Sequence, residues 1–409
     1  MKPKPVMPAL GIYIHIPFCR SKCDYCDFYS LACGDKNVMD RYQRALLAHV
    51  EELAPRAENH VVDSVYIGGG TPSYYGADRI KALLKLIRKK YRLSRDCEIT
   101  MEANPDSIDR KAFAHLRRAG VNRFSLGVQS ASDRELKEVG RPHSFQQVRE
   151  AVEAARKAKV SNLSLDLIYG LPGQDMHSWR DTVEQALALS PEHLSCYGLK
   201  VEEGTPLWRR RETEDLPDGD TQADMYLWAV DRLAQAGYRQ YEISNFAKPG
   251  MESRHNLKYW MTEEYIGFGP AAHSDFGGWR YSFVRSIDRY VDGVLSGGSI
   301  VAESEQIPHR GRSAEYLMLR LRTSRGVEEA EYRREFQMNF DPLAVRLKEY
   351  WKQGWAEQVE GRWRLTPKGF LVSNQLIGEL MDIQEAATLE GTLEYTQKLE
   401  RRRTDLRKE

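Results

Sequence analysis

The 409-residue sequence lacks long hydrophobic runs and an export signal. No apolar segment approaches the roughly 20 residues that a membrane-spanning helix needs. The N-terminal stretch MKPKPVMPAL has neither the apolar region nor the small-residue cleavage site of a secretory signal peptide. We therefore expect a cytoplasmic protein without a transmembrane segment.

A strong charge of either sign is also absent, because 60 basic and 59 acidic residues leave a formal net charge of +1. Charges of both signs are spread over the surface and create no long-range field. Phosphate binding needs clustered cations, which this balance does not provide. The composition therefore argues against a nucleic-acid partner.

Cysteine is scarce as well. Six cysteines in a chain of this length do not make a disulfide framework. Three of them fall between positions 19 and 26, whereas Cys33, Cys97 and Cys196 lie apart. This spacing favours a reducing compartment, in which the clustered trio binds a metal.

Between residue 10 and about residue 200, short apolar segments alternate with longer amphipathic stretches. Short buried strands that alternate with helices indicate βαβ units and a parallel sheet. The six strand-like segments are residues 10–16, 61–69, 97–103, 122–128, 162–170 and 193–199. Six units are fewer than the eight of a closed TIM barrel. We therefore predict an α/β fold with an open, partial (β/α)6 barrel.

The alternation loosens after the sixth unit. Residues 221–238 form a helical pattern that ends at Gly237, and short strands with glycine-rich turns follow. Near residue 308 the composition changes to helices followed by a strand, a turn and a strand, which is typical of a winged helix. We predict a barrel domain over residues 1–235, an α+β extension over 236–305, a winged-helix-like domain over 306–375 and a charged helical tail over 376–409.

The most specific motif is the group Cys19, Cys23 and Cys26, directly after the first predicted strand. Three thiolates within eight residues leave a tetrahedral zinc site incomplete, unless His15 or Cys33 supplies a fourth ligand. They can instead hold three irons of a [4Fe-4S] cluster and leave the fourth iron open for another ligand. The spacing favours the iron–sulfur cluster and leaves zinc as the alternative.

Polar and glycine residues gather at the ends of the next strands. Gly69 and Gly70, in a run of three glycines before Thr71, indicate a close approach of the backbone, because each glycine costs roughly 0.5–1 kcal/mol in regular structure. A tight turn is the alternative. The functional groups of β/α barrels gather at such strand ends. Further polar residues near strand ends are Glu102, Gln129, Asp166 and, on a loop between two helices, Arg141.

The segment HNLKYW, residues 255–260, is the third motif. On a helical turn His255 and Tyr259 share a face, and Trp260 adds a flat apolar surface. An imidazole beside aromatic rings is a candidate axial ligand for heme iron. A hydrogen-bonded structural histidine is the alternative, and His273 is a second candidate imidazole.

The C-x3-C-x2-C loop within YIHIPFCRSKCDYCDF resembles the radical-SAM superfamily. Within it, the string resembles the branch of the oxygen-independent coproporphyrinogen III oxidases and the HemW-type heme chaperones. The resemblance implies a [4Fe-4S] cluster on the three cysteines and S-adenosylmethionine (SAM) beside it. The positions that match SAM-binding residues of this branch are Tyr13, Tyr25, Gly69, Gly70, Thr71, Glu102, Gln129, Arg141 and Asp166.

Two features separate the sequence from the oxidases that it resembles. Those enzymes carry a further cysteine where Phe28 stands here, and they have a longer N-terminal extension, whereas only twelve residues precede Tyr13. HNLKYW resembles the signature that is associated with heme binding in the HemW-type chaperones. The resemblance therefore implies a protein that binds heme at or near His255.

Such a chaperone is expected to pass heme to an acceptor protein. Assembly of the cluster would then regulate heme transfer or the formation of a homodimer. The alternative is a radical-SAM enzyme that removes hydrogen from a tetrapyrrole, as the oxygen-independent coproporphyrinogen III oxidases do. The intact cysteine loop keeps this alternative open.

Overall fold

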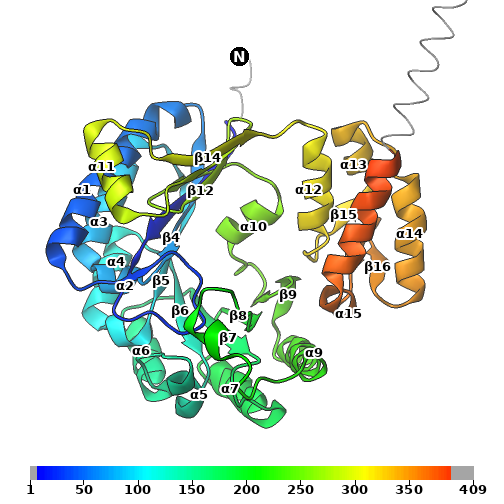
Figure 1. The fold of residues 1–409 in the computed structure, drawn as a ribbon, viewed down its shortest axis with the longest axis horizontal. Coiled ribbons are helices and arrows are strands. Elements are labelled where there is room, and N and C mark those ends of the chain that lie inside the picture. Colours follow the sequence, from blue (N-terminus) through cyan, green and yellow to red (C-terminus); the bar gives the residue numbers. More distant parts are fainter. Residues whose placement is uncertain (1–6, 388–409) are drawn as a thin grey trace, which may run out of the picture. The chain divides into compact units, whose positions relative to one another are not determined.

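The computed structural model describes residues 7–387. The chain divides into two compact units (Figure 1). The first unit runs to residue 306, apart from residues 241–243 and 260–262, which belong with residues from 307 onward to the second. The finer four-part division stays a prediction.

The first unit is built on a twelve-stranded sheet, in which seven neighbouring strands run parallel: the six predicted strands and β11 (Tyr265–Phe268) beside β1. All six lie where the apolar segments predicted them, and the sheet remains open. The partial (β/α)6 barrel is therefore confirmed. In sheet order the six strands are β1 (Ala9–Ile16), β4 (Val61–Gly69), β5 (Leu93–Ala103), β6 (Arg123–Gln129), β7 (Leu163–Tyr169) and β8 (His193–Gly198).

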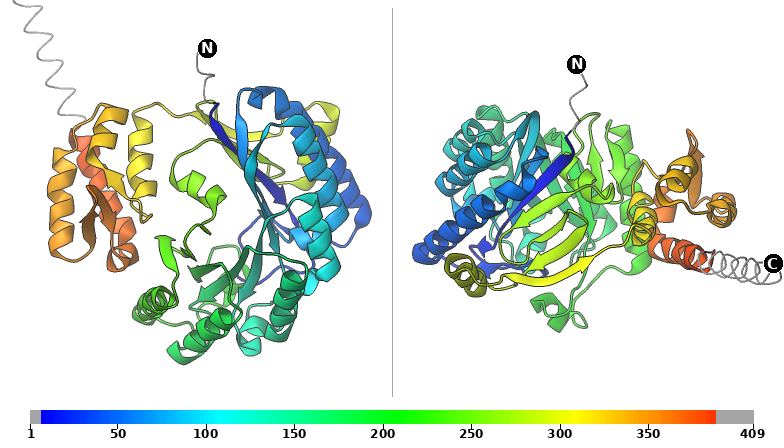
Figure 2. Two further views of the ribbon diagram at one scale, coloured as in Figure 1. Left: turned by 180° about the vertical axis from the view of Figure 1, so that it is seen from behind. Right: turned by 90° about the horizontal axis from the view of Figure 1, so that it is seen from above.

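The barrel helices cover the convex face of this curved sheet (Figures 1 and 2). Each buries an apolar stripe, as α3 does with Ile80, Leu83, Leu84 and Ile87 at the spacing of one helical face. The covering helices are α1 (Lys36–Leu53), α3 (Ala77–Lys90), α4 (Arg110–Ala119), α6 (Phe145–Lys157) and α7 (Met176–Ala188), and η1 (Ala54–Ala57) extends α1.

Side-chain caps fix where several of these helices begin. The Asp109 carboxylate accepts a hydrogen bond from the amide of Ala112 at the start of α4. Ser144 and Gln147 form a reciprocal capping box at the start of α6. Such caps satisfy backbone amides that have no partner within the helix.

The loops that follow the parallel strands meet at one edge of the sheet, because all crossovers return the chain in the same direction. This edge carries only short elements, so side chains and backbone line it directly. The short elements are β2 (Phe18–Cys19), β3 (Leu31–Ala32), α2 (Pro72–Tyr75), η2 (Pro105–Ser107), α5 (Asp133–Glu138) and α8 (Pro206–Arg210).

Further strands extend the parallel sheet at both edges. β11 (Tyr265–Phe268) pairs with β1, and β10 (Asn245–Ala247) pairs with β8. Figure 1 shows α10 (Arg254–Trp260) on the inner side of the sheet, opposite the barrel helices. The remaining elements are α9 (Gly219–Gln235), β9 (Arg239–Glu242), β12 (His273–Phe276), β13 (Trp279–Phe283), α11 (Ile287–Ser296) and β14 (Val301–Gln306).

The second unit has the predicted winged-helix pattern. Its antiparallel sheet has the strand order β15-β17-β16, and Tyr332 packs against Phe336 and Phe340 in its core. The elements are α12 (Gly311–Arg320), β15 (Val327–Glu328), α13 (Glu329–Phe336), α14 (Asp341–Lys352), β16 (Ala356–Val359), β17 (Arg362–Leu365) and α15 (Pro367–Leu371), then a helix over 373–387.

Part of the predicted helical tail, residues 388–409, lies outside the described residues. Over residues 7–387, none of the helices combines the length and the hydropathy that a membrane span requires.

Candidate cluster and cofactor site

A cavity of about 450 Å³ lies at the C-terminal ends of the parallel strands. Every predicted cluster or cofactor residue lines it except Tyr13 and His255. The predicted residues in its wall are Cys19, Cys23, Tyr25, Cys26, Gly69, Gly70, Thr71, Glu102, Gln129, Arg141 and Asp166. The open barrel thus brings together predicted residues from the ends of five strands and from the loop that carries Arg141, as the strand-end rule predicted.

The three cysteines lie on a loop that is tied to its neighbours. The backbone amide of Asp24 donates to the carbonyl of Val139 (3.1 Å), and the amide of Cys26 donates to the carbonyl of Cys23 (3.1 Å). The Thr71 hydroxyl donates to the sulfur of Cys19 at 3.4 Å. These contacts hold the loop over the cavity.

The surroundings of the cysteines suit thiolates, the form in which cysteine binds iron. A guanidinium nitrogen of Arg141 lies 3.4 Å from the sulfur of Cys23, and a cationic donor stabilises a thiolate. Burial raises the pKa of the Cys19 thiol, whereas the hydrogen bond from Thr71 lowers it. Two of the three sulfurs, those of Cys19 and Cys23, therefore have a side-chain hydrogen-bond donor in the cavity wall.

The zinc alternative requires a fourth ligand, for which His15 and Cys33 are the candidates. His15 hydrogen-bonds through Nδ1 to the Tyr13 hydroxyl (2.9 Å) and through Nε2 to the carbonyl of Tyr29 (2.8 Å). Both ring nitrogens are thus engaged, and burial lowers the pKa of His15 to about 4. Cys33, the other candidate, does not line the cavity, but its backbone amide donates to the carbonyl of Cys19 (3.2 Å).

The glycine run packs the end of β4 against the chain that leads to the cysteines. Gly69 has φ of +110°, and a Cβ there would lie 2.6 Å from the His15 ring. A Cβ on Gly70 would lie 2.8 Å from the carbonyl oxygen of Phe18. The close approach that the glycines predicted is therefore made, in this structure, to the protein's own backbone and side chains.

Glu102 is a buried acid that holds a proton more readily than usual. The Tyr66 hydroxyl donates to one carboxylate oxygen (2.8 Å), and the amide of Gly69 donates to the other (3.0 Å). Burial, together with the nearby charge of Asp166, raises the pKa of Glu102 to about 7, although these two hydrogen bonds act in the opposite direction. The carboxyl group therefore titrates near neutral pH.

Asp166, on β7, is held by hydroxyl groups from its own and neighbouring strands. Ser125 donates to its carboxylate at 2.8 Å and Ser195 at 2.7 Å. Burial raises the pKa of Asp166, while these serine hydrogen bonds and the charge of Arg123 act in the opposite direction. The carboxylate is therefore fixed in direction before any ligand arrives.

Arg141 joins three parts of the wall. Besides its contact with Cys23, it donates to the carbonyl of Gly127 (2.8 Å) and to the Asn104 side chain (3.0 Å). Gln129, at the end of β6, has φ of +67°, which is rare for a residue other than glycine. Strained backbone of this kind is often found at functional sites.

His255 lies outside this cavity and is fully buried on α10. Its Nδ1 is 2.8 Å from the Ser64 hydroxyl, and its Nε2 is 2.8 Å from the Tyr259 hydroxyl. Burial lowers the pKa of His255 to about 3. Heme ligation would require the loss of one of these hydrogen bonds, so that role stays a prediction.

Several wall residues were not predicted from the sequence. Asn104 directly follows β5, so the rule that found Glu102 could also have found it. Tyr66 lies within β4 and stacks on the His255 ring, with 5.3 Å between ring centroids. Because Tyr66 also donates to Glu102, it connects α10 to the cavity wall. Other unpredicted wall residues are Arg123, Ser125, His193, Ser195, Tyr197, Lys200 and Asn256. His273 lies on β12, outside this cavity.

Two protein-family models match the sequence. The model of the radical SAM superfamily matches residues 13–186, which include the cysteine loop and the first five parallel strands. The model of the HemN C-terminal domain matches residues 307–372, which lie in the second unit.

Similar proteins cover nearly the whole chain. The heme chaperone HemW of Bacillus subtilis (strain 168) is 35% identical over 373 residues, covering 90% of this chain and 98% of that protein. HemW of Escherichia coli (strain K12) is also 35% identical, over 91% of this chain and 98% of the relative. The solved structure of the E. coli coproporphyrinogen III oxidase HemN, a radical SAM enzyme, has a TM-score of 0.80 at 24% identity, covering 93% of this chain and 91% of its own.

The chain belongs to the HemW family of the radical SAM superfamily. The family predicted from the cysteine loop and HNLKYW is therefore confirmed. Membership of the superfamily implies a [4Fe-4S] cluster and SAM. The likeness to HemN shows a shared fold.

We predict that Gly69→Ala destabilises the protein more than Gly76→Ala does. Both positions have nearly the same φ, +110° and +112°, so both variants should lose about 1–3 kcal/mol from backbone strain. Only at Gly69 does the new Cβ meet the His15 ring, and overpacking adds about 1–3 kcal/mol. Denaturant unfolding of the two variants measures the difference, and equal losses would contradict the packing role of Gly69.

Proposed function

We propose that this protein is a heme chaperone, which binds heme as cargo and passes it to an acceptor protein. The observation that carries the proposal is its similarity, over nearly the whole length, to proteins named heme chaperone HemW. Phe28, which stands where the resembling oxidases have a further cysteine, supports the same choice. We place the protein in the cytoplasm, in keeping with six free cysteines among the described residues.

Within this proposal, Cys19, Cys23 and Cys26 hold a [4Fe-4S] cluster in the strand-end cavity. When bound, the cluster supplies an open iron to which SAM coordinates. The chain's own contribution is to fix the three sulfurs and to donate hydrogen bonds to two of them, from Thr71 and Arg141.

The wall offers matching groups for each part of SAM. Glu102 is placed to accept a hydrogen bond from the amino group, and Asp166 is a fixed acceptor for ribose hydroxyls. Arg141 is the cation for the carboxylate, a contact worth about 1.5–3 kcal/mol. We propose that Tyr25, Gly69, Gly70, Thr71 and Gln129 complete the binding surface. Tyr13 contributes indirectly, because its hydroxyl hydrogen-bonds to His15.

A second candidate function is a radical SAM enzyme that acts on a tetrapyrrole. The specific observation in its favour is the wall itself, which unites the cysteines with buried acids and a guanidinium. A chaperone binds heme without changing it, whereas the enzyme converts a tetrapyrrole into a product. Product analysis therefore distinguishes the two functions.

Each of Cys19→Ser, Cys23→Ser and Cys26→Ser should lose most of the iron and sulfide that the wild type binds. A cluster on three thiolates loses an essential ligand in each variant. Anaerobic reconstitution followed by iron, sulfide and zinc analysis measures the effect. Cys33→Ser is the matched control and should keep wild-type iron. Zinc in place of iron, lost in Cys33→Ser, would instead support the zinc alternative.

SAM should bind the cluster-loaded protein about tenfold more tightly at pH 8 than at pH 6. Only the ionised form of Glu102 accepts a hydrogen bond at both oxygens, and with a pKa of about 7 roughly one molecule in ten is ionised at pH 6. Calorimetric titration at both pH values measures the ratio. Glu102→Gln removes this titration, so its ratio should be smaller by the same factor. Equal ratios in the wild type and in Glu102→Gln would exclude Glu102 as the group that makes SAM binding depend on pH.

Rising pH strengthens SAM binding through Glu102 but lowers the stability of the ligand-free protein. Because its pKa in the folded state lies above the value of about 4.3 for an unfolded chain, its protonated form favours folding. Its contribution is fully present below pH of about 4.3 and is lost as the pH rises through about 7.

Purified, reconstituted protein should bind hemin and show a Soret band. Given SAM, a reductant and coproporphyrinogen III, it should form no protoporphyrinogen. Absorbance titration and product analysis measure the two properties. Absence of hemin binding would refute the chaperone proposal, whereas robust turnover would establish the enzyme instead.

A further inference from the structure

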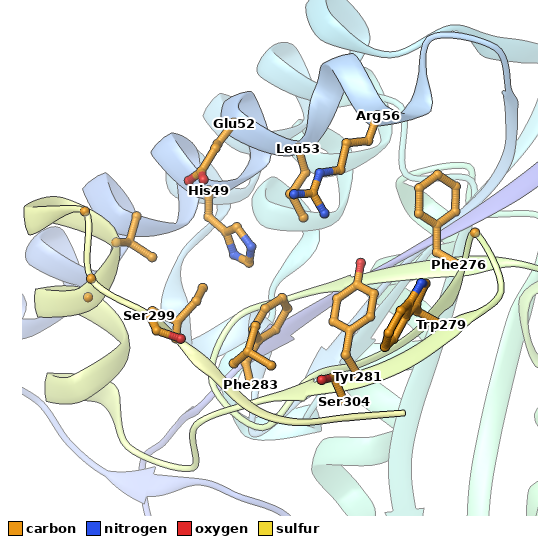
Figure 3. A pocket seen from close by; sticks show the side chains of 17 residues that line it. His49, Glu52, Leu53, Arg56, Phe276, Trp279, Tyr281, Phe283, Ser299 and Ser304 are labelled. Carbon is orange, nitrogen blue, oxygen red and sulfur yellow. The ribbon is translucent and has the colours of Figure 1, made fainter. Parts of the chain in front are cut away.

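A second cavity, of about 610 Å³, lies apart from the cluster site within the first unit (Figure 3). Its volume falls within the roughly 300–1,000 Å³ that small-molecule and cofactor sites occupy. Helix α1 and η1 form one wall, and β12, β13 and the segment from α11 to β14 form the other. It shares no lining residue with the strand-end cavity.

One wall of this α1–β13 cavity is aromatic. Trp279, Tyr281 and Phe283 alternate along β13 and so project from one face of the strand. Phe276 of β12 continues this surface, and Leu53 of α1 lies opposite (Figure 3). Trp279 remains 47% exposed although it is large and apolar. The surface therefore suits a wide, flat, apolar ligand.

The cationic side chain of Arg56 lies at the end of the cavity that Tyr281 and Trp279 line. In Figure 3 the guanidinium of Arg56 lies beside Leu53 and above the Tyr281 hydroxyl, and its charge acts on Tyr281. No ion pair of Arg56 occurs within residues 7–387. Glu52, one helical turn earlier, also lines the cavity, and its negative charge acts on Tyr290, the hydrogen-bond partner of His49. The end near Arg56 thus favours a carboxylate on the ligand.

His49 supplies a metal-binding atom. Its Nδ1 is 2.8 Å from the Tyr290 hydroxyl, and in the described part of the chain its Nε2 has no hydrogen-bond partner. Burial lowers the pKa of His49 to about 3, so the imidazole is neutral at physiological pH. A neutral imidazole whose other nitrogen is held by an oxygen is the usual arrangement of a metal-ligating histidine.

We propose that the α1–β13 cavity binds the heme that the proposed function requires, with His49 Nε2 as the iron ligand. The porphyrin ring lies against Trp279 and its aromatic neighbours, and Arg56 pairs with a propionate. This inference rests on the proposed function but differs from the assignment to His255, whose ring nitrogens are both engaged. Because the two cavities share no residue, heme and SAM can be bound at the same time.

The test is a hemin titration of the reconstituted full chain, followed by Soret absorbance. His49→Ala should weaken binding at least tenfold and shift the Soret band. The matched control is His177→Ala, which changes an exposed histidine of α7. His255→Ala is measured in parallel. A loss confined to His255→Ala would overturn the inference and support the earlier assignment.

Two exposed positions keep the test decisive if His49→Ala folds poorly. Trp279→Ala should weaken hemin binding at least fivefold, whereas Trp351→Ala, at a 60% exposed tryptophan of α14, should not. Arg56→Glu should weaken it by a similar factor, whereas Arg117→Glu, on the surface of α4, should not. Wild-type affinity in both cavity variants would overturn the inference.

Metal-free protoporphyrin IX separates iron ligation from packing. Its affinity should fall in the Trp279 and Arg56 variants, as that of hemin does. The His49→Ala variant, in contrast, should bind it with wild-type affinity. Equal losses of both ligands in His49→Ala would overturn the role of His49 as iron ligand. If the wild type binds neither ligand, the proposed function itself fails. If it binds hemin and all cavity variants match it, only this inference fails.

Discussion

The close packing of the end of β4 against the chain that leads to Cys19 is the constraint on which the site depends. The amide of Gly70 donates to the carbonyl of Ile16 (2.7 Å), and the amide of Thr71 donates to the carbonyl of Phe18 (2.8 Å). Both bonds require a backbone approach that a side chain would block. They place the Thr71 hydroxyl beside the first cysteine. The other residues of the cavity wall are positioned by the fixed register of the paired parallel strands.

The two histidines considered for heme differ in what their ring nitrogens already do. Both are buried and neutral, because burial lowers each pKa to about 3. His255 has a hydroxyl partner at each nitrogen, and so it stabilises the inner face of the barrel through Ser64 and Tyr259. Among residues 7–387, His49 has a hydrogen-bond partner at Nδ1 only. A metal ligand needs one lone pair that is free, and this requirement distinguishes the two residues.

Much of the fold followed from local patterns. The apolar segments predicted the six parallel strands, because a strand that is buried on both faces must be apolar along its length. Of the predicted cluster and cofactor residues, all but Tyr13 and His255 line the cavity, because parallel strands bring their ends to one edge. Tyr66 and Arg123 were missed, since they lie within strands and nothing local distinguishes them from structural residues. Tyr13 and His255 carry family motifs, yet their side chains bind neighbours outside the cavity.

The sequence by itself determined the order of strands and helices, the three-cysteine loop and the family, because each of these is written in residue type and short-range spacing. The tertiary structure alone decided which partners each polar group has. Glu102 acquires its raised pKa from burial, and Trp279 comes to face His49 across a cavity although 230 positions separate them in the chain. Contacts of this kind depend on how distant segments pack, and no local pattern encodes them.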